Sequence, residues 1–331
     1  MHYADGSKSG CKDVLPNQFD PQEENCSDLM TSRFIERMIE AEKPDLIVFT
    51  GDNIYGPDAT DAVKSMNAAF APAIKSKIPW AAVLGNHDQE STLSREDVMK
   101  HIVGMDNTLS QLNPSGFDDF IDGFGNYNLE VHGPQGSPYV NYSILNLYFL
   151  DSGDYSTNPS VPGYGWVKPS QKFWLRQTAS VLPGLVYFHM PLLEYANLDM
   201  SNLTGSRQEG ISSAYVNSGL FTTLRNIGSG AIKAVFTGHD HINDFCGKFN
   251  TIHLCYGGGS GYHGYGKPGW SRRARMVVAS LQKTSNGEWG EIDSIKTWKR
   301  LDDENLTLID AQLLWRYVKM PFRRCRDCML S

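Results

Sequence analysis

The chain has 331 residues, of which 40% are apolar and 20% are charged, and its formal net charge is −7. This composition is that of an ordinary globular protein. The acidic balance and the lack of a lysine and arginine block argue against nucleic acid as a partner. Apolar runs such as LIVF and WAAVL are far shorter than the about 20 residues that cross a bilayer, so no membrane partner is expected either.

The first part of the chain alternates predicted helices with short apolar strands. A helix is predicted over 27–43, where four apolar side chains share one helical face and Pro44 ends the segment. A strand follows over 44–49, a helix over 63–74 and a further strand over 79–84. Each strand is followed at once by a polar loop.

The same alternation continues in the middle of the chain. Strands are predicted over 143–150, 184–188 and 231–236, and a helix is predicted to begin near Pro169, a residue suited to the first turn. The long polar segment 106–138 is interpreted as a surface excursion. Strands that alternate with helices indicate an α/β fold, in which ligands bind beyond the carboxyl ends of the strands.

The last quarter has a different pattern. Three strands without intervening helices are predicted over 275–282, 291–301 and 306–315, so the fold is expected to end in an antiparallel layer. No linker divides the chain. We therefore predict one domain over 1–316 and a tail over 317–331.

The cysteines and glycosylation sequons bear on the compartment. The cysteines form three pairs along the chain, namely Cys11 with Cys26, Cys246 with Cys255, and Cys325 with Cys328. The first pair could close a surface loop and the second could bridge a hairpin, whereas the third lacks the second pair that a zinc knuckle needs. Sequons occur at Asn25, Asn141, Asn202 and Asn305.

These features favour an extracellular or vacuolar glycoprotein that passes through the secretory pathway. The first ten residues, however, contain no apolar signal segment. A chain that is itself the whole product is therefore expected in the cytoplasm. Oligomeric state is left open.

Unusual polar clusters follow four of the predicted strands, with the sequences GDNIY, GNHD, YFH and GHDH. They offer seven side chains, Asp52, Tyr55, Asn86, His87, His189, His239 and His241. Carboxylate, phenolate, amide and imidazole groups together suit hard and borderline metal ions. Two ions about 3.5–4 Å apart can hold a phosphate and supply hydroxide at neutral pH, and Asp52 is the candidate to bridge them.

The four clusters differ in specificity. A single GD after a strand is common. In GNHD, Asn86 and His87 stand side by side after an apolar strand with little packing rationale. In GHDH, His239 and His241 alternate along an extended loop and share a face, so they can approach neighbouring ions. The ordered combination of all four is the strong signal.

This combination resembles the purple acid phosphatases, within the calcineurin-like metallophosphoesterases. The resemblance covers nearly the whole chain, and Tyr55 is the residue that points to the purple group, where a tyrosine binds ferric iron. The stretches TSRFIERMIEAEKPDLIVFTGDNIYG and SIKTWKRLDDENLT look most like plant members often labelled "probable inactive purple acid phosphatase". The resemblance implies a four-layer α/β/β/α sandwich with mixed sheets that ends in antiparallel strands.

The resemblance also implies a role for each metal ligand. Asp52 would bridge the two ions, and Tyr55 and His241 would bind Fe(III). A second, divalent ion of zinc, manganese or iron would take three ligands, Asn86, His189 and His239.

The resemblance further implies the reaction. A metal-bound hydroxide would attack the phosphorus of a phosphate monoester, and His87 would orient the phosphate or protonate the leaving oxygen. The substrate would be a phosphorylated small molecule or a phosphoprotein. Tyr262 and His263, in a glycine-rich loop, are weaker candidates for substrate binding. Arg272 and Arg273 could meet an anionic substrate, but a solvated pair is the favoured interpretation.

The opening residues MHYADG depart from the family pattern. The first family motif is Asp-x-Gly or Asp-x-His, and Met1 and His2 match only its last two positions. On this interpretation an N-terminal strand and the first metal-binding Asp are missing, and Asp5 is the nearest replacement. The loss should weaken metal retention.

Three hypotheses remain. The first is a metal-dependent phosphoric monoester hydrolase of the acid phosphatase type. The second is a catalytically silent member that binds phosphate or a partner, favoured also by the lack of a second histidine between Met190 and Gly210. The third is an incomplete product that does not fold stably. A nucleic-acid phosphodiesterase is the nearest enzymatic rival, but the acidic charge and Tyr55 argue against it.

Overall fold

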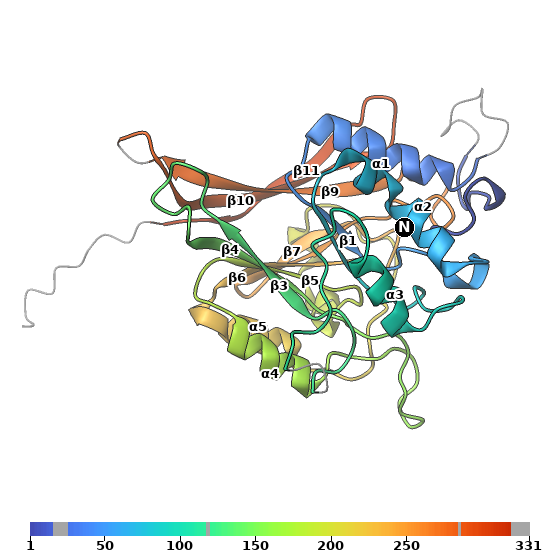
Figure 1. Ribbon diagram of the computed structural model, residues 1–331, viewed down its shortest axis with the longest axis horizontal. Coiled ribbons are helices and arrows are strands. Elements are labelled where there is room, and N and C mark those ends of the chain that lie inside the picture. Colours follow the sequence, from blue (N-terminus) through green and yellow to red (C-terminus); the bar gives the residue numbers. More distant parts are fainter. Residues whose placement is uncertain (16–25, 117–119, 284–285, 319–331) are drawn as a thin grey trace, which may run out of the picture.

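The structure is a computed structural model that describes residues 1–15, 26–116, 120–283 and 286–318 (Figure 1). Its α-helices are α1 (Leu29–Glu42), α2 (Ala62–Ser76), α3 (Arg95–Val103), α4 (Pro169–Thr178) and α5 (Leu220–Asn226). The strands of the first three quarters are β1 (Ile47–Thr50), β2 (Trp80–Val83), β3 (Tyr127–His132), β4 (Ser143–Phe149), β5 (Gly184–Tyr187), β6 (Ile232–Thr237), β7 (Cys246–Phe249) and β8 (Ile252–Tyr256). The last strands are β9 (Arg273–Lys283), β10 (Trp289–Leu301) and β11 (Leu308–Arg316).

The strands form three hydrogen-bonded sheets. β1 and β2 pair in parallel, and β11, β10 and β9 form an antiparallel sheet. The largest sheet has the order β3-β4-β5-β6-β8-β7, in which β4, β5, β6 and β8 are parallel and the two edge strands are antiparallel. The predicted α/β class, mixed sheet and antiparallel ending are confirmed.

Two apolar cores separate the layers. The first joins α1–α3, the β1–β2 pair and the inner faces of the other sheets, with Phe49, Trp80 and Phe236 among its buried side chains. The second fills the space between the six-stranded sheet and α4 and α5, around Trp174 and Val186. Figure 1 shows α4 and α5 on the opposite side of the molecule from α1, α2 and α3. The arrangement is therefore helix, sheet, sheet, helix.

Local sequence explains where the elements begin and how they are buried. The Asp61 side chain caps α2 by accepting a hydrogen bond from Lys64 N at 3.1 Å, and α4 begins at Pro169 as predicted. Nearly all residues of β4 and every residue of β5 are buried, because the sheet is covered on both faces. Continuous apolar runs therefore identified these strands.

The prediction of a surface excursion over 106–138 is wrong, because this segment contains β3. β3 pairs with β4 at an edge of the sheet, and its last three residues are exposed. Its polar composition is that of an edge strand, which hid it from a search for apolar runs. The short helices α3 and α5 were also not predicted.

Both disulfides that the sequence left open, Cys11–Cys26 and Cys246–Cys255, are present. The second lies between the adjacent strands β7 and β8. Cys325, Cys328, Asn25 and most of the predicted tail lie outside the described residues, so the predicted domain boundary stays a prediction. Within the described ranges, no helix is long and apolar enough to cross a bilayer.

Candidate metal centre

The predicted ligands come from the loops that follow four strands of two different sheets. Asp52 and Tyr55 follow β1, Asn86 and His87 follow β2, and His189 follows β5. His239 and His241 follow β6. Because these strand ends meet at one edge, residues almost 190 positions apart lie in one cluster.

The glycines of these motifs allow the loops to approach closely. A Cβ on Gly51 would lie 2.6 Å from His189 Nδ1, and a Cβ on Gly85 would lie 2.1 Å from Asp52 Oδ1. Asp52 itself adopts φ 48°, in the left-handed region that costs energy for a residue with a side chain. The GD and GN pairs therefore have a steric origin, because a Cβ on Gly51 would clash with His189 and a Cβ on Gly85 would clash with Asp52.

The Asp52 carboxylate lies at the centre of the cluster. Its Oδ2 atom is 2.9 Å from His2 Nε2 and 3.0 Å from His189 Nε2. Its Oδ1 atom accepts a hydrogen bond from the backbone N–H of His87 at 2.9 Å. Asp52 belongs to two triads, one with His2 and His87 and one with His189 and His239, and the ligand atoms of each triad lie within 4.8 Å of one another.

His189, His239 and Asn86 form one side of the cluster. His189 Nδ1 lies 2.8 Å from the Thr50 carbonyl, to which it donates, so Nε2 carries the lone pair and faces His239 Nδ1 at 3.2 Å. Asn86 Nδ2 lies 3.4 Å from the Tyr155 hydroxyl. Asn86 Oδ1 is buried and has no hydrogen-bond partner among the described residues.

His2, Tyr55 and His241 form the other side. The His2 ring centroid lies 4.4 Å from that of His241 and 4.9 Å from that of Tyr55. His241 Nδ1 lies 2.8 Å from the carbonyl oxygen of Tyr265, to which it donates, which leaves its Nε2 lone pair free for a metal. Sequence reasoning placed His2 in a motif but gave it no ligand role, although the Asp-x-His pattern was the available signal.

The pKa shifts of His2, His239 and Asp52 favour the forms that bind metals, whereas the shift of His189 favours its protonated form. Burial lowers the pKa of His2 to about 4 and that of His239 to about 3, so both imidazoles are neutral at neutral pH. Burial also lowers the pKa of His189, but the nearby Asp52 carboxylate outweighs burial and raises it overall. Burial raises the pKa of Asp52, yet His189 and His2 hold it well below its ordinary value. Neutral imidazoles and an ionised carboxylate are the forms that bind metals.

These residues fit a pair of metal ions. The donor set combines a shared carboxylate, neutral imidazoles, an amide oxygen and a phenol, which suits hard and borderline ions. The unpaired Asn86 Oδ1 supports this fit, because a buried acceptor without a partner is costly unless a ligand completes it. The roles of the individual residues stay predictions.

His87 is held by a carboxylate that sequence reasoning missed. Its Nδ1 atom makes a short contact with Glu90 Oε2, three residues further along the chain. The neighbouring Asp88 is buried and has a structural role, because it accepts hydrogen bonds from Gly85 N at 2.7 Å and Ile54 N at 3.0 Å. Asp88 therefore joins the loops after β1 and β2.

Tyr262 and His263 are engaged inside the fold. The Tyr262 hydroxyl donates to Asp302 Oδ2 at 2.6 Å. His263 lies 2.8 Å from Asp58 Oδ2 and 2.9 Å from the Gly10 carbonyl. Their predicted substrate-binding role gains no support from these contacts and stays a prediction.

Two further expectations can be compared with the structure. The Asp5 carboxylate accepts hydrogen bonds from Thr60, at 3.3 Å from its N–H and 2.8 Å from its hydroxyl, and is not in either triad. The interpretation of Arg272 and Arg273 as a solvated pair is wrong, because both are buried. Arg273 instead forms an ion pair with Asp244 at 2.7 Å.

Comparison with known proteins assigns the family. Residues 24–243 match the family described as calcineurin-like phosphoesterase. The chain belongs to the calcineurin-like phosphoesterases. It is 58% identical to "Probable inactive purple acid phosphatase 29" of Arabidopsis thaliana over 95% of this chain and 84% of that protein. It is 52% identical to "Probable inactive purple acid phosphatase 14" of the same plant, over 95% of this chain and 82% of that protein.

This calcineurin-like phosphoesterase is also similar to a yeast protein and to a solved structure. The yeast "Phosphatase DCR2" of Saccharomyces cerevisiae is 35% identical over 88% of this chain and 52% of that protein. A solved structure described as a dimetal phosphatase from Danio rerio has a TM-score of 0.56 at 14% identity and covers 88% of this chain and 89% of that one. The second similarity concerns the fold alone. The family resemblance predicted from the motifs is confirmed.

Proposed function

We infer that this calcineurin-like phosphoesterase is a dinuclear-metal phosphatase that hydrolyses phosphate monoesters. The observation that carries the proposal is the position of Asp52, whose carboxylate belongs to both triads of candidate ligands. A shared carboxylate with neutral imidazoles on either side is an arrangement suited to two neighbouring ions. The name of the yeast relative, a phosphatase, is consistent with the proposal.

In this proposal the residues divide into two groups. Asp52, Tyr55 and His241, together with His2, would hold Fe(III). Asn86, His189 and His239 would hold a zinc, manganese or iron ion with Asp52. Bound ions would supply Lewis acidity toward a phosphoryl group and a nucleophile at neutral pH.

His87 would act on the leaving group. Its backbone N–H is fixed by Asp52 Oδ1, and its imidazole is fixed through Nδ1 by Glu90. The other ring nitrogen, Nε2, is then the atom that gives a proton to the departing alcohol oxygen. The substrate would be a phosphorylated small molecule or a phosphoprotein.

The first test is the metal content of the purified chain, measured beside two variants. His239→Ala removes a candidate ligand, whereas His132→Ala removes an exposed histidine on β3 and is the matched control. We expect about two metals per chain in wild type and in the control and at most one in His239→Ala. Visible absorption should accompany the metals, because tyrosinate bound to Fe(III) is coloured. Equal metal content in all three proteins would contradict the proposed centre.

The second candidate function is phosphate binding without turnover. The names of the plant relatives, which include the word "inactive", favour it. Turnover of methyl phosphate by the metal-loaded protein, lost in His239→Ala and kept in His132→Ala, supports the phosphatase. Two bound metals and phosphate binding with no hydrolysis would support the silent binder.

A further inference from the structure

The loop after β4 is a polar strand-end loop to which no candidate ligand belongs. It begins with the sequence DSGDY over 151–155 and continues as a hairpin, in which Tyr155 pairs with Tyr164 in antiparallel fashion. β4 is parallel to β5 and β6, whose loops carry candidate ligands, so this loop begins at the same edge of the sheet. Residues 151–165 are called the β4 loop below.

The β4 loop is tied to Asn86 by two routes. Asn86 Nδ2 donates to the Tyr155 hydroxyl at 3.4 Å. Gln89 Nε2 donates both to the Asn86 carbonyl at 2.7 Å and to Asp154 Oδ2 at 3.0 Å. The side chain and the main chain of this candidate ligand are therefore both held by the loop.

The contact with Tyr155 decides which end of the Asn86 amide faces the candidate centre. An asparagine amide has a donor end and an acceptor end, and a half-turn of the amide exchanges them. With Nδ2 on the Tyr155 hydroxyl, Asn86 Oδ1 is buried and has no partner among the described residues. Only the oxygen end can bind a cation, so Tyr155 selects the orientation that a metal needs.

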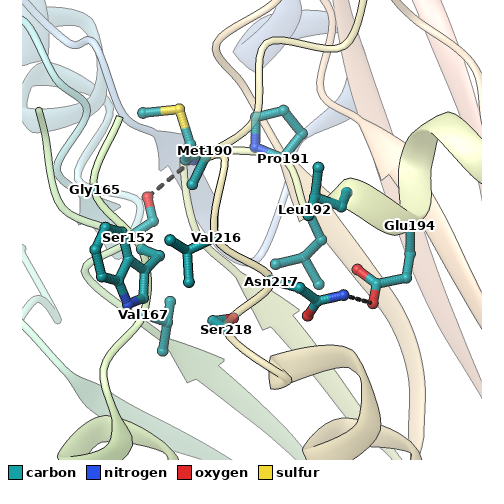
Figure 2. A pocket seen from close by; sticks show the side chains of 13 residues that line it. Ser152, Gly165, Val167, Met190, Pro191, Leu192, Glu194, Val216, Asn217 and Ser218 are labelled. Atoms are coloured by element: carbon teal, nitrogen blue, oxygen red, sulfur yellow. Dashed lines mark hydrogen bonds between the residues drawn. The ribbon is translucent and has the colours of Figure 1, made fainter. Parts of the chain in front are cut away.

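The same loop contacts the other two candidate ligands of the divalent ion. Ser152 Oγ accepts a hydrogen bond at 2.9 Å from the backbone N–H of Met190, the residue after His189 (Figure 2). The Tyr164 ring lies against that of His239, with centroids 4.6 Å apart and planes at 88°. The β4 loop therefore contacts Asn86 and His239 directly and His189 through the following residue.

The start of the β4 loop is anchored independently of any metal. Asp151 forms an ion pair with Arg95, whose Nε donates to Asp151 Oδ2 at 3.0 Å. Their side chains are 0% and 11% exposed, respectively. Arg95 Nη1 also donates to Gln89 Oε1 at 2.7 Å, which fixes the residue that holds the Asn86 carbonyl. A loop anchored in this way can keep ligands in place before an ion binds.

The proposed iron side lacks such contacts. Across the parts of the chain that the structure describes, no hydrogen bond, ion pair or ring contact joins the β4 loop to His2, Tyr55 or His241. The imidazole of His241 donates instead to the Tyr265 carbonyl, in the glycine-rich loop. The β4 loop thus acts on one half of the candidate centre.

We propose that the β4 loop sets the affinity of the protein for the divalent ion alone, and that Tyr155 is the positioning residue for Asn86. The inference rests on the proposed function, which divides the ligands between two ions. Contacts that orient metal ligands are worth about 10–100-fold in metal affinity. Tyr155→Phe keeps the ring but removes the acceptor for Asn86 Nδ2, so it should weaken binding of the divalent ion and leave the iron in place.

The test is a titration of the purified, iron-loaded chain with Zn²⁺ at graded free concentrations, followed by elemental analysis and visible absorption. Tyr155→Phe should need about tenfold more free Zn²⁺ than wild type for half-occupancy, whereas the absorption of tyrosinate bound to Fe(III) should stay unchanged. Tyr142→Phe makes the same change at a tyrosine that is 66% exposed and lies outside the β4 loop, and it should match wild type. Asp154→Ala, which releases Gln89, is a second variant and should also weaken Zn²⁺ binding.

The outcomes separate this inference from the proposed function. Unchanged Zn²⁺ affinity in Tyr155→Phe and Asp154→Ala overturns the inference, while two metals and hydrolysis of methyl phosphate by wild type would still support the phosphatase. Parallel loss of zinc and of visible absorption in Tyr155→Phe also overturns the inference, because the loop would then act on both ions. A selective loss of Zn²⁺ affinity supports it, whether or not wild type hydrolyses the ester. Wild type that binds neither metal overturns both.

Discussion

Replacement of Asp244 by asparagine should destabilise the protein more than any other single removal of a charge in its surroundings. Asp244 Oδ2 lies 2.6 Å from Lys299 Nζ and 2.7 Å from an Arg273 guanidinium nitrogen, and its Oδ1 accepts from Ser206 N at 2.7 Å. All three charged side chains are at most 4% exposed. This ion cluster ties the segment after His241 to β9 and β10.

The expected loss of stability in Asp244→Asn follows from the burial of the ion pairs. Removal of one partner of a buried ion pair costs about 3–5 kcal/mol, because the other charge is left without compensation. Asparagine keeps the acceptor for Ser206 but not the negative charge. With an unfolding entropy of about 2.1 cal/mol/K per residue, a chain of this length loses about 4–7 °C in Tm.

The matched control is Asp310→Asn. Asp310 also contacts Lys299 Nζ, at 2.7 Å, but its side chain is 30% exposed. Solvent screening reduces the value of such a contact to about 1 kcal/mol, which corresponds to about 1–2 °C. Differential scanning calorimetry at neutral pH measures both.

The effect should depend on pH. Burial raises the pKa of Asp244, but Lys299 outweighs burial and holds it below its ordinary value of 3.8. A depressed carboxyl pKa contributes stability that is present above 3.8 and is lost as the pH falls through the folded-state pKa. The difference in Tm between wild type and Asp244→Asn should therefore become smaller in acid. A melting temperature within 1 °C of wild type at pH 7, or equal losses in both variants, would refute this reasoning.

Three further predictions concern other contacts. Glu90→Gln should lower kcat for ethyl phosphate about 100-fold, because His87 loses the contact that orients it. The kcat for 2,4-dinitrophenyl phosphate, whose leaving group needs no proton, should stay nearly unchanged. Equal losses of kcat on both substrates would count against this role of Glu90. Burial raises the pKa of Asp28 to about 6, so ionisation of this carboxyl destabilises the folded protein. This destabilisation is absent below about pH 4 and is complete above about pH 6. Asp28→Asn should therefore raise Tm at pH 7.5 and not at pH 4, and a pH-independent difference would contradict this. Cys11→Ser, which removes the disulfide to Cys26 across a separation of 15 residues, should lower Tm by about 4 °C. In reductant, which also opens Cys246–Cys255 in both proteins, wild type and variant should melt together; coincident melting without reductant would disprove the prediction.

The strand ends and their candidate ligands could be predicted from sequence for a physical reason. β2 and β5 are buried throughout and β6 nearly so, while β1 is half-buried; all four are apolar runs, so the polar residues after them stand out. Gly51 and Gly85 mark the close approach of these loops to His189 and to Asp52, respectively. These signals are local in the chain and needed no knowledge of the fold.

The contacts that surround the ligands could not be predicted in this way. Glu90 is an ordinary loop carboxylate until the turn brings it to His87. The ring of Tyr265 stacks on His241 with centroids 3.9 Å apart, and that pairing spans two loops. Arg273 looks solvated in the sequence because its partner Asp244 is 29 positions away. Tertiary arrangement decides each of these cases.

The candidate ligands divide between two layers that share no backbone hydrogen bonds among the residues that the structure describes. Asp52, Asn86 and His87 belong to the β1–β2 pair, whereas His189 and His239 belong to the six-stranded sheet. Ions held by both groups would fasten one layer to the other, and ligand-linked stabilisation at 1,000 times Kd amounts to about 4 kcal/mol. Suppose that a substitution in either core shifts one layer by a fraction of an ångström. The affinity for metal would then change before any secondary structure is lost.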